Sequence, residues 1–317
     1  LESRVQAGID EIERQLAQAV DSADTFVAEA SAHLLNAGGK RFRPLLVMLA
    51  AEFGDPAQPE VPRSAVVVEL THLATLYHDD VMDEAAMRRG APSANSRWGN
   101  SVAILVGDYL FAQASDLVSD LGPECVRIQA RTFSRLVQGQ IRETLGPSEN
   151  DDQLEHYLSV VADKTGSLIA TAARLGAKMA GAPLEVEETL TKFGERIGAA
   201  FQLSDDIIDI ASETGDSGKT PGTDLREGVP TLPTLLALRT TDSESERLRS
   251  LLAKPLTDDD ELAEAISLLR AHPSMDEARA YVRAETDAAQ ALLATLPDNS
   301  AREALLTLCT TVATRLG

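Results

Sequence analysis

The sequence predicts an all-α protein, and three observations carry that prediction. The chain has 317 residues, 44% hydrophobic and 25% charged, so it can bury a sizeable core. Aromatic residues make up only 4%, and β-branched residues do not gather into short alternating runs. Leu, Ala, Val and Ile recur instead at helical spacing. We therefore expect a helical bundle that folds as a single domain over residues 1–317.

Turn-forming residues divide the chain into helical segments, in order along the sequence. Breaks fall where Gly, Pro and short polar residues collect, at 38–39, 54–62, 88–99, 122–123, 146–152, 181–183, 215–233 and 273. The stretches after Asp83 and after Asp209 are long, and long loops inside a helical domain are usually functional. Between the breaks we expect helices at 2–20, 22–37, 42–53, 63–84, 100–120, 123–145, 152–181, 185–214, 232–240, 243–254, 258–271, 275–295 and 298–316.

Charge and composition exclude several classes of function. Lys and Arg total 29 against 50 Asp and Glu, which gives a net charge of −21 and makes nucleic acid an unfavourable partner. We expect no integral membrane segment, because no apolar run approaches the roughly 18–20 residues of a span. The charged segment 1–16 has no apolar stretch like that of a signal peptide, so we expect a cytoplasmic protein. Cys125 and Cys309 lie far apart and indicate neither a disulfide framework nor a thiolate metal site.

The most specific pattern is Asp-Asp-x-x-Asp, which occurs twice, at 79–83 and at 205–209. Each copy ends an apolar helical stretch and precedes a long loop. Residues i and i+4 on a helix are neighbours, so the first and last aspartates of each copy share one face. Like charges there destabilise a helix unless a cation neutralises them, and Mg²⁺ takes carboxylates, water and substrate phosphates. By contrast, the run Asp258 to Asp260 predicts only an N-cap at a helix start.

Polar and basic residues near the two motifs extend this interpretation. On a helical wheel His72 and Thr75 share a face with Asp79, and Gln202 shares a face with Asp205. Arg and Lys are fixed donors for phosphate oxygens, so their grouping near carboxylates indicates a site for a second, metal-free diphosphate. These basic residues are Lys40, Arg41, Arg43, Arg88, Arg89, Lys164 and Lys219.

Together these segments resemble the trans-polyprenyl diphosphate synthases, the geranylgeranyl and longer-chain synthases in particular. The resemblance runs from about Gly38 to Pro233. The matching segments are GGKRFRP (38–44), HLATLYHDDVMDEAAMRRG (72–90), GDYL (107–110), KTG (164–166), FQLSDDIIDI (201–210) and GKTPGTDL (218–225).

The resemblance implies a helical bundle of the isoprenoid synthase type around a deep central cavity, usually as a homodimer. It also implies Mg²⁺-dependent condensation of isopentenyl diphosphate with an allylic prenyl diphosphate. Ionisation of the allylic substrate leaves a cation, which the isopentenyl double bond attacks before a proton is lost. The product would be all-trans and at least twenty carbons long.

By resemblance, each site residue receives a role. Asp79, Asp83 and Asp205 would bind about three Mg²⁺, with Asp80, Asp206 and Asp209 assisting. Arg88, Lys164 and Lys219 would contact the allylic diphosphate. Lys40, Arg43, His72 and Arg89 would hold isopentenyl diphosphate. Thr165 and Gln202 would lie near the developing carbocation.

Two further positions bear on product length and substrate binding. Ala74 and Thr75 are small where short-chain relatives often carry aromatic residues, which favours a product of twenty carbons or more. The helical wheel places Thr75, but not Ala74, on the face of Asp79. Val229 stands where many relatives have Lys, so one diphosphate contact is missing.

Two other functions compete with this one. A terpene cyclase also ionises allylic diphosphates, but its cavity is lined with aromatic rings, and only 4% of this chain is aromatic. A catalytically silent subunit of a heteromeric synthase would be expected to lose one Asp-rich motif, and both are present here.

Overall fold

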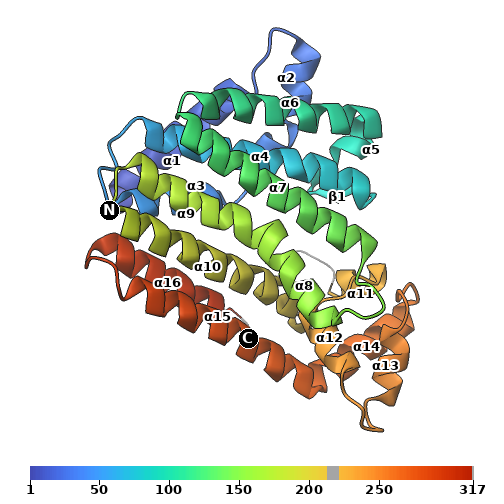
Figure 1. Ribbon diagram of the computed structural model, residues 1–317. Coiled ribbons are helices and arrows are strands. Elements are labelled where there is room, and N and C mark those ends of the chain that lie inside the picture. The colour runs from blue at the N-terminus through green and yellow to red at the C-terminus, as the bar shows by residue number, and fades with distance from the viewer. Residues whose placement is uncertain (213–220, 316–317) are drawn as a thin grey trace. The chain divides into compact units, whose positions relative to one another are not determined.

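Helices dominate the computed structural model, which describes residues 1–212 and 221–315 (Figure 1). The prediction of an all-α fold is confirmed. The elements are α1 (Glu2–Ala19), α2 (Thr25–Asn36), α3 (Phe42–Ala51), α4 (Glu60–Met82), β1 (Met87–Arg88), β2 (Ala91–Pro92), α5 (Ala94–Trp98), α6 (Asn100–Ser119), α7 (Pro123–Leu145), α8 (Gln153–Val161), the π turn η1 (Ala162–Gly166), α9 (Ser167–Met179), α10 (Leu184–Ala211), α11 (Thr223–Glu227), α12 (Leu232–Leu238), α13 (Glu246–Leu252), α14 (Asp259–Ala271), α15 (Pro273–Leu293) and α16 (Ser300–Thr314).

The chain divides into two compact units. Unit 1 comprises Leu1–Ser134, Leu168–Thr191 and Leu296–Arg302. Unit 2 comprises Arg135–Ser167, Lys192–Thr295 and Glu303–Gly317. The single domain over 1–317 and its deep central cavity stay predictions.

Unit 1 is built around α4, which packs against α1, α3, α5 and α6. Residues 64–71 of α4 are all buried, as expected for a helix that neighbours cover on several sides. Two glycines allow close helix approach. A Cβ on Gly107 of α6 would lie 2.3 Å from the His78 Nε2 atom of α4, and one on Gly176 of α9 would lie 2.3 Å from the Val47 carbonyl oxygen of α3.

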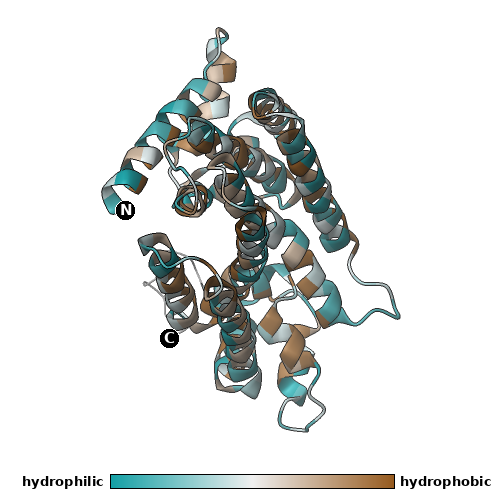
Figure 2. Cartoon of the chain, turned by 60° about the vertical axis from the view of Figure 1, so that its left-hand side comes forward, coloured by the Kyte–Doolittle hydropathy of each residue, from teal (hydrophilic) through white to brown (hydrophobic). Residues whose placement is uncertain are grey.

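In unit 2, α12 packs against α8, α13, α14 and α15. Its first turn carries Pro233 and begins with a capping box between Thr231 and Thr234. The predicted N-cap at Asp258 is confirmed, since its carboxylate accepts hydrogen bonds from the backbone N–H groups of Asp260 and Glu261, both at 3.0 Å. Figure 2 shows that many helices have a hydrophobic and a hydrophilic side, the pattern from which they were predicted.

Most predicted helix ends are correct within a few residues, and three features differ. The segment 152–181, predicted as one helix, is divided by the π turn at 162–166. The predicted loop 88–99 contains helix α5 and part of the antiparallel pair β1 and β2. Helix α11 lies inside the predicted break 215–233. All three are too short for hydrophobic periodicity to reveal.

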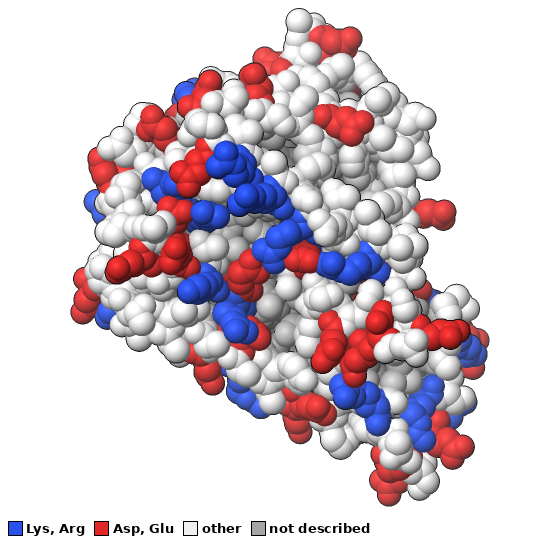
Figure 3. Space-filling model, in the orientation of Figure 1, with Lys and Arg blue, Asp and Glu red and all other residues white. Residues whose placement is uncertain are grey.

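The surface of the described residues is rich in ion pairs, and Figure 3 shows acidic and basic side chains next to one another. Helix α6 is the one described helix long and apolar enough, by length and composition, to cross a membrane. The sequence predicted no such helix. About a third of it is buried, and it packs against α2, α4 and α5. Core helices of soluble proteins meet the same criterion, so α6 alone is weak evidence for a span.

Candidate functional site

The first Asp-rich motif ends helix α4 of unit 1, and its middle aspartate points inward. The Asp80 side chain is fully buried and accepts a hydrogen bond from Arg88 Nε at 2.6 Å. Burial raises the pKa of Asp80 above its ordinary value, although Arg88 opposes the shift. The Asp80 Oδ2 atom is buried without a hydrogen-bond partner. Asp79 is partly exposed and Asp83 exposed, as expected for positions i and i+4 on the other face.

Unit 1 also contains three arginines around a histidine, and we call these four residues the cationic cluster: Arg41, Arg43, His72 and Arg89. Arg41 pairs with Glu13 and, at 3.3 Å, with the buried Glu69. Arg89 Nη1 donates hydrogen bonds to the carbonyl oxygens of Leu34, at 3.0 Å, and Gly38. The Arg43 Nε atom is buried without a partner, and burial lowers the pKa of Arg43.

The electrostatics of His72 show how positive this cluster is. Burial, and then the charges of Arg43 and Arg89, lowers the pKa of His72 well below 6.5, so the ring is neutral at pH 7. Arg41 and Arg89 both have positive φ angles, of 48° and 53°, which bulky side chains rarely adopt. A strained, desolvated group of cations that lacks enough carboxylates is a favourable site for an anion. Lys40, the fourth predicted member, is exposed beside Arg41 in the sequence.

The predicted chain-length residues lie on different sides of α4. Ala74 is fully buried, and its carbonyl oxygen is 3.2 Å from the position of a Cβ on Gly107, so it faces α6. Thr75 is partly exposed, and its hydroxyl donates to the His72 carbonyl oxygen at 2.7 Å. Both chain-length roles stay predictions.

The second motif lies near the end of α10, within unit 2, and again its middle aspartate is buried. Asp206 is 4% exposed and accepts hydrogen bonds from the Tyr157 hydroxyl, from Gln202 Nε2 at 3.2 Å and from the Leu232 N–H at 3.3 Å. Burial raises the pKa of Asp206 to about 6. Asp205 is exposed and pairs with Arg315 at 2.9 Å.

The π turn at 162–166 carries Lys164 and Thr165. π turns occur often at functional sites, because the extra residue redirects neighbouring side chains. Lys164 Nζ pairs with Glu143 Oε2 at 2.6 Å, and the Thr165 hydroxyl donates to Gln202 Oε1 at 3.2 Å. Arg135 holds the turn, since its guanidinium donates to Asp163 and, on α10, to Glu195, at 2.8 and 2.6 Å. The predicted Lys219 lies outside the described residues.

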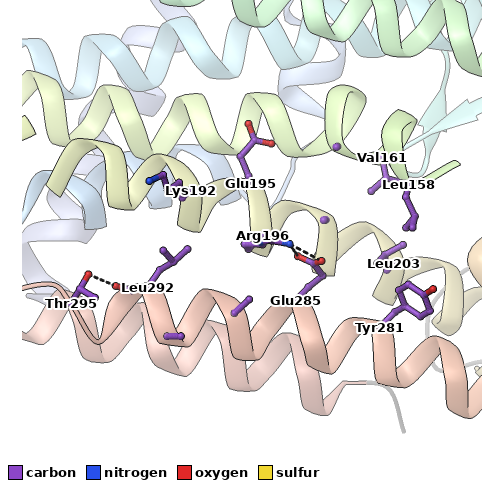
Figure 4. A pocket seen from close by; sticks show the side chains of 14 residues that line it. Leu158, Val161, Lys192, Glu195, Arg196, Leu203, Tyr281, Glu285, Leu292 and Thr295 are labelled. Carbon is purple, nitrogen blue, oxygen red and sulfur yellow. Dashed lines mark hydrogen bonds and ion pairs between the residues drawn. The ribbon is translucent and has the colours of Figure 1, made fainter. Parts of the chain in front are cut away.

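A cavity of about 760 Å³ in unit 2 lies on another face of α10. It is bordered by α8, η1, α10 and α15, and Figure 4 shows Arg196 of α10 paired with Glu285 of α15 beside it. Its α10 residues, which include Lys192, Ala199 and Leu203, are rotated on the helical wheel from Gln202 and Asp205.

Each motif supplies carboxylate oxygens alone, which is the donor set that Mg²⁺ and Ca²⁺ prefer. Within residues 1–212 and 221–315, no group of three or more His, Cys, Asp or Glu side chains stands in metal-binding geometry. Two of the three carboxylates in each motif face outward from the helix, so a motif alone gives an incomplete coordination shell. Substrate phosphates and water commonly complete such a shell around Mg²⁺.

Several residues that build these sites were not predicted from the sequence. They are Glu69, Arg135, Tyr157, Asp163, Glu195 and Arg315. The sequence offered one signal for Glu69, which is a charged residue one helical turn before His72. No comparable signal existed for Tyr157 or Arg315, whose partners are 49 and 110 or more residues away.

Comparison with known proteins gives consistent matches. A family described as polyprenyl synthetase matches residues 24–269. The chain is 53% identical over 314 residues to a nonaprenyl diphosphate synthase of Mycobacterium tuberculosis, covering 99% of this chain and 94% of that protein. A geranylgeranyl pyrophosphate synthase of Corynebacterium glutamicum, crystallised with calcium and isoprenyl diphosphate, has a TM-score of 0.91 at 48% identity, with 100% and 98% of the two chains covered.

A more distant solved structure agrees with these. A decaprenyl diphosphate synthase of Rhodobacter capsulatus has a TM-score of 0.89 at 32% identity and covers 100% of this chain and 99% of that one. The residues that match the family include both Asp-rich motifs and the whole cationic cluster. The chain therefore belongs to the polyprenyl synthetase family of trans-prenyltransferases.

Proposed function

We propose that this protein condenses isopentenyl diphosphate with an allylic prenyl diphosphate and releases an all-trans prenyl diphosphate of at least twenty carbons. The observation that carries the proposal lies on α4. His72, within the cationic cluster, and Asp79, in the carboxylate motif, are separated by two helical turns, about 10 Å along the axis. Side chains for a metal-free anion and for a metal-bound anion thus project from one helix.

In this proposal the residues divide their tasks between two diphosphates. Asp79, Asp83 and Asp205 would bind about three Mg²⁺, and Asp80, Asp206 and Asp209 would assist. Such ions would supply positive charge to neutralise the charge that develops on the leaving diphosphate. Arg88, Lys164 and Lys219 contact that diphosphate. Lys40, Arg43, His72 and Arg89 hold isopentenyl diphosphate, and a neutral His72 can gain a proton when the anion arrives.

The chemical step breaks the allylic C–O bond and forms a new C–C bond. The Thr165 hydroxyl and the Gln202 amide oxygen lie near the developing cation and stabilise it through their dipoles. The isopentenyl double bond attacks the cation, and the proton lost afterwards goes to the released diphosphate. Exclusion of water protects the cation from hydrolysis. The relatives, which include a nonaprenyl and a geranylgeranyl synthase, support a product of twenty carbons or longer.

To test this function, purified protein is incubated with isopentenyl diphosphate, Mg²⁺ and an allylic primer of five, ten, fifteen or twenty carbons. The products are then identified by mass spectrometry. We expect a discrete product series that disappears with a chelator. Asp79→Asn and Asp205→Asn should each reduce turnover by orders of magnitude. Asp258→Asn removes the same charge but keeps an N-capping side chain, so it should leave turnover unchanged. A folded protein that elongates no primer would instead favour a silent subunit.

We further propose that the protein is a cytoplasmic homodimer. Helix α6 exposes two large apolar side chains, Ile104 at 42% and Leu105 at 66%, and a second copy of the chain would cover them. Sedimentation velocity should give a dimer for the wild type and a monomer for Leu105→Glu. A wild-type monomer at micromolar concentration would refute the dimer.

A further inference from the structure

Tyr157 has no role in the proposed function, yet its hydroxyl points at the centre of the second motif. The residue lies on α8, and its hydroxyl donates to Asp206 Oδ2. A tyrosine hydroxyl can donate a hydrogen bond, and the carboxylate oxygen that it faces accepts it.

Asp206 also contacts Gln202, which lies one turn earlier on α10. The second oxygen of the carboxylate, Oδ1, accepts from Gln202 Nε2 at 3.2 Å. An ionised carboxylate only accepts hydrogen bonds, so the amide nitrogen of Gln202 must face it. The amide oxygen then points the other way, where it accepts from the Thr165 hydroxyl at 3.2 Å.

The four side chains form one chain of hydrogen bonds within unit 2: Tyr157, Asp206, Gln202 and Thr165. The Leu232 N–H is a further donor to Asp206 Oδ2, at 3.3 Å. With both of its oxygens engaged and only 4% of its surface exposed, Asp206 has little freedom to rotate. The amide of Gln202 is consequently held in one of its two possible orientations.

We propose that Tyr157 is a positioning residue, which acts through Asp206 to keep the Gln202 amide oxygen turned toward Thr165 and the reacting carbon. This inference rests on the proposed function, because it assumes that Thr165 and Gln202 lie near the carbocation. A carbonyl oxygen presents negative charge to a cation, whereas a flipped amide presents its NH₂ group. Tyr157 thereby acts on the cation without touching the substrate.

The variant Tyr157→Phe tests the proposal, with Tyr281→Phe as its matched control. Tyr281 lies in unit 2 beside the cavity on α15, and no described residue hydrogen-bonds its hydroxyl. We expect Tyr157→Phe to lower kcat about tenfold, the effect of losing one hydrogen bond, with KM for both substrates within about twofold. Tyr281→Phe should match the wild type.

The decisive kinetic readout is the ratio of hydrolysed primer to elongated product. A poorly stabilised cation is more reactive and discriminates less between water and the isopentenyl double bond. Tyr157→Phe should therefore release several times more prenyl alcohol per coupling event. A merely structural role would reduce the fraction of active protein and leave this ratio unchanged. An unchanged ratio in a folded variant would overturn the proposal.

A second measurement does not depend on turnover. The side-chain amide signals of Gln202 in a ¹H–¹⁵N spectrum, assigned by their loss in Gln202→Glu, should shift in Tyr157→Phe and not in Tyr281→Phe. Unchanged signals would refute the relay. If the wild type elongated no primer while these signals shifted, the proposed function would fail and the hydrogen-bonded relay would stand.

Discussion

The hydroxyl of Tyr77 offers a measurable test of how α4 is anchored in unit 1. Tyr77 is fully buried. Its hydroxyl donates to the Ala30 carbonyl oxygen at 2.6 Å and accepts from the Leu34 N–H at 3.2 Å, both on α2. The variant Tyr77→Phe removes these hydrogen bonds and retains the aromatic ring that fills the core.

The expected cost follows from what the two backbone groups can do afterwards. Ala30 and Leu34 are four residues apart on one helix, so their carbonyl and N–H groups can still pair with each other. The variant therefore loses a net buried hydrogen bond without leaving both groups unpaired. We expect the free energy of unfolding to fall by about 1–2 kcal/mol, within the range for one buried hydrogen bond.

Urea denaturation followed by circular dichroism measures this difference, and the slope with denaturant should stay the same. Tyr109→Phe is the control, because its hydroxyl makes a single 3.4 Å contact with the Asp21 carbonyl oxygen at the surface. That variant should cost less than about 0.5 kcal/mol. Equal effects of the two variants would refute the reasoning that buried hydroxyl contacts hold α4 against α2.

Three other predictions follow from the described residues. Thr75→Phe should shorten the longest product seen by mass spectrometry at little cost in stability. Ala74→Phe should also shorten the product, but it should destabilise unit 1 by about 1–3 kcal/mol because Ala74 is fully buried and leaves no room for a larger side chain. An unchanged product in both variants would contradict the chain-length assignment. Burial raises the pKa of Cys309 from 9.0 to about 12, so any stabilisation that depends on its neutral thiol persists below pH 9 and is lost as the pH rises through 12. Neither Cys309 nor the buried Cys125 should react with a thiol reagent at pH 8 before unfolding. Rapid labelling of the folded protein would disprove this. Because its pKa is lowered, His72 should give the ¹⁵N signals of a neutral ring from pH 6.5 to 8. Its contribution to the free energy of unfolding should decrease as the pH falls below 6.5. A ring that titrates near 6.5 would show that the cationic cluster is open to water.

Much of the fold could be predicted from the sequence because its helices are long and strongly periodic. The run of buried residues on α4 and the N-cap at Asp258 are local features, so a single stretch of sequence contains all the information they need. The π turn and helix α5 span five residues each, too few for periodicity to detect.

The candidate sites also combine local features, which the sequence predicts, with contacts between distant residues, which it does not predict. The shared face of Asp79 and Asp83 follows from spacing, since residues i and i+4 are neighbours on a helix. The burial of Asp80 was not predicted. The contact between Tyr157 and Asp206 joins residues 49 positions apart, and that between Arg135 and Glu195 joins residues 60 apart. Such contacts depend on how helices pack, which no helical wheel contains.

The inward aspartate of each motif has a consequence for reading loss-of-function data. The Asp80 carboxylate binds Arg88 of the hairpin that follows it. Asp206 binds the first N–H of α12. Replacing either aspartate therefore frees a downstream segment as well as removing a carboxylate. Inactive variants at neighbouring positions of one motif can therefore fail for different reasons.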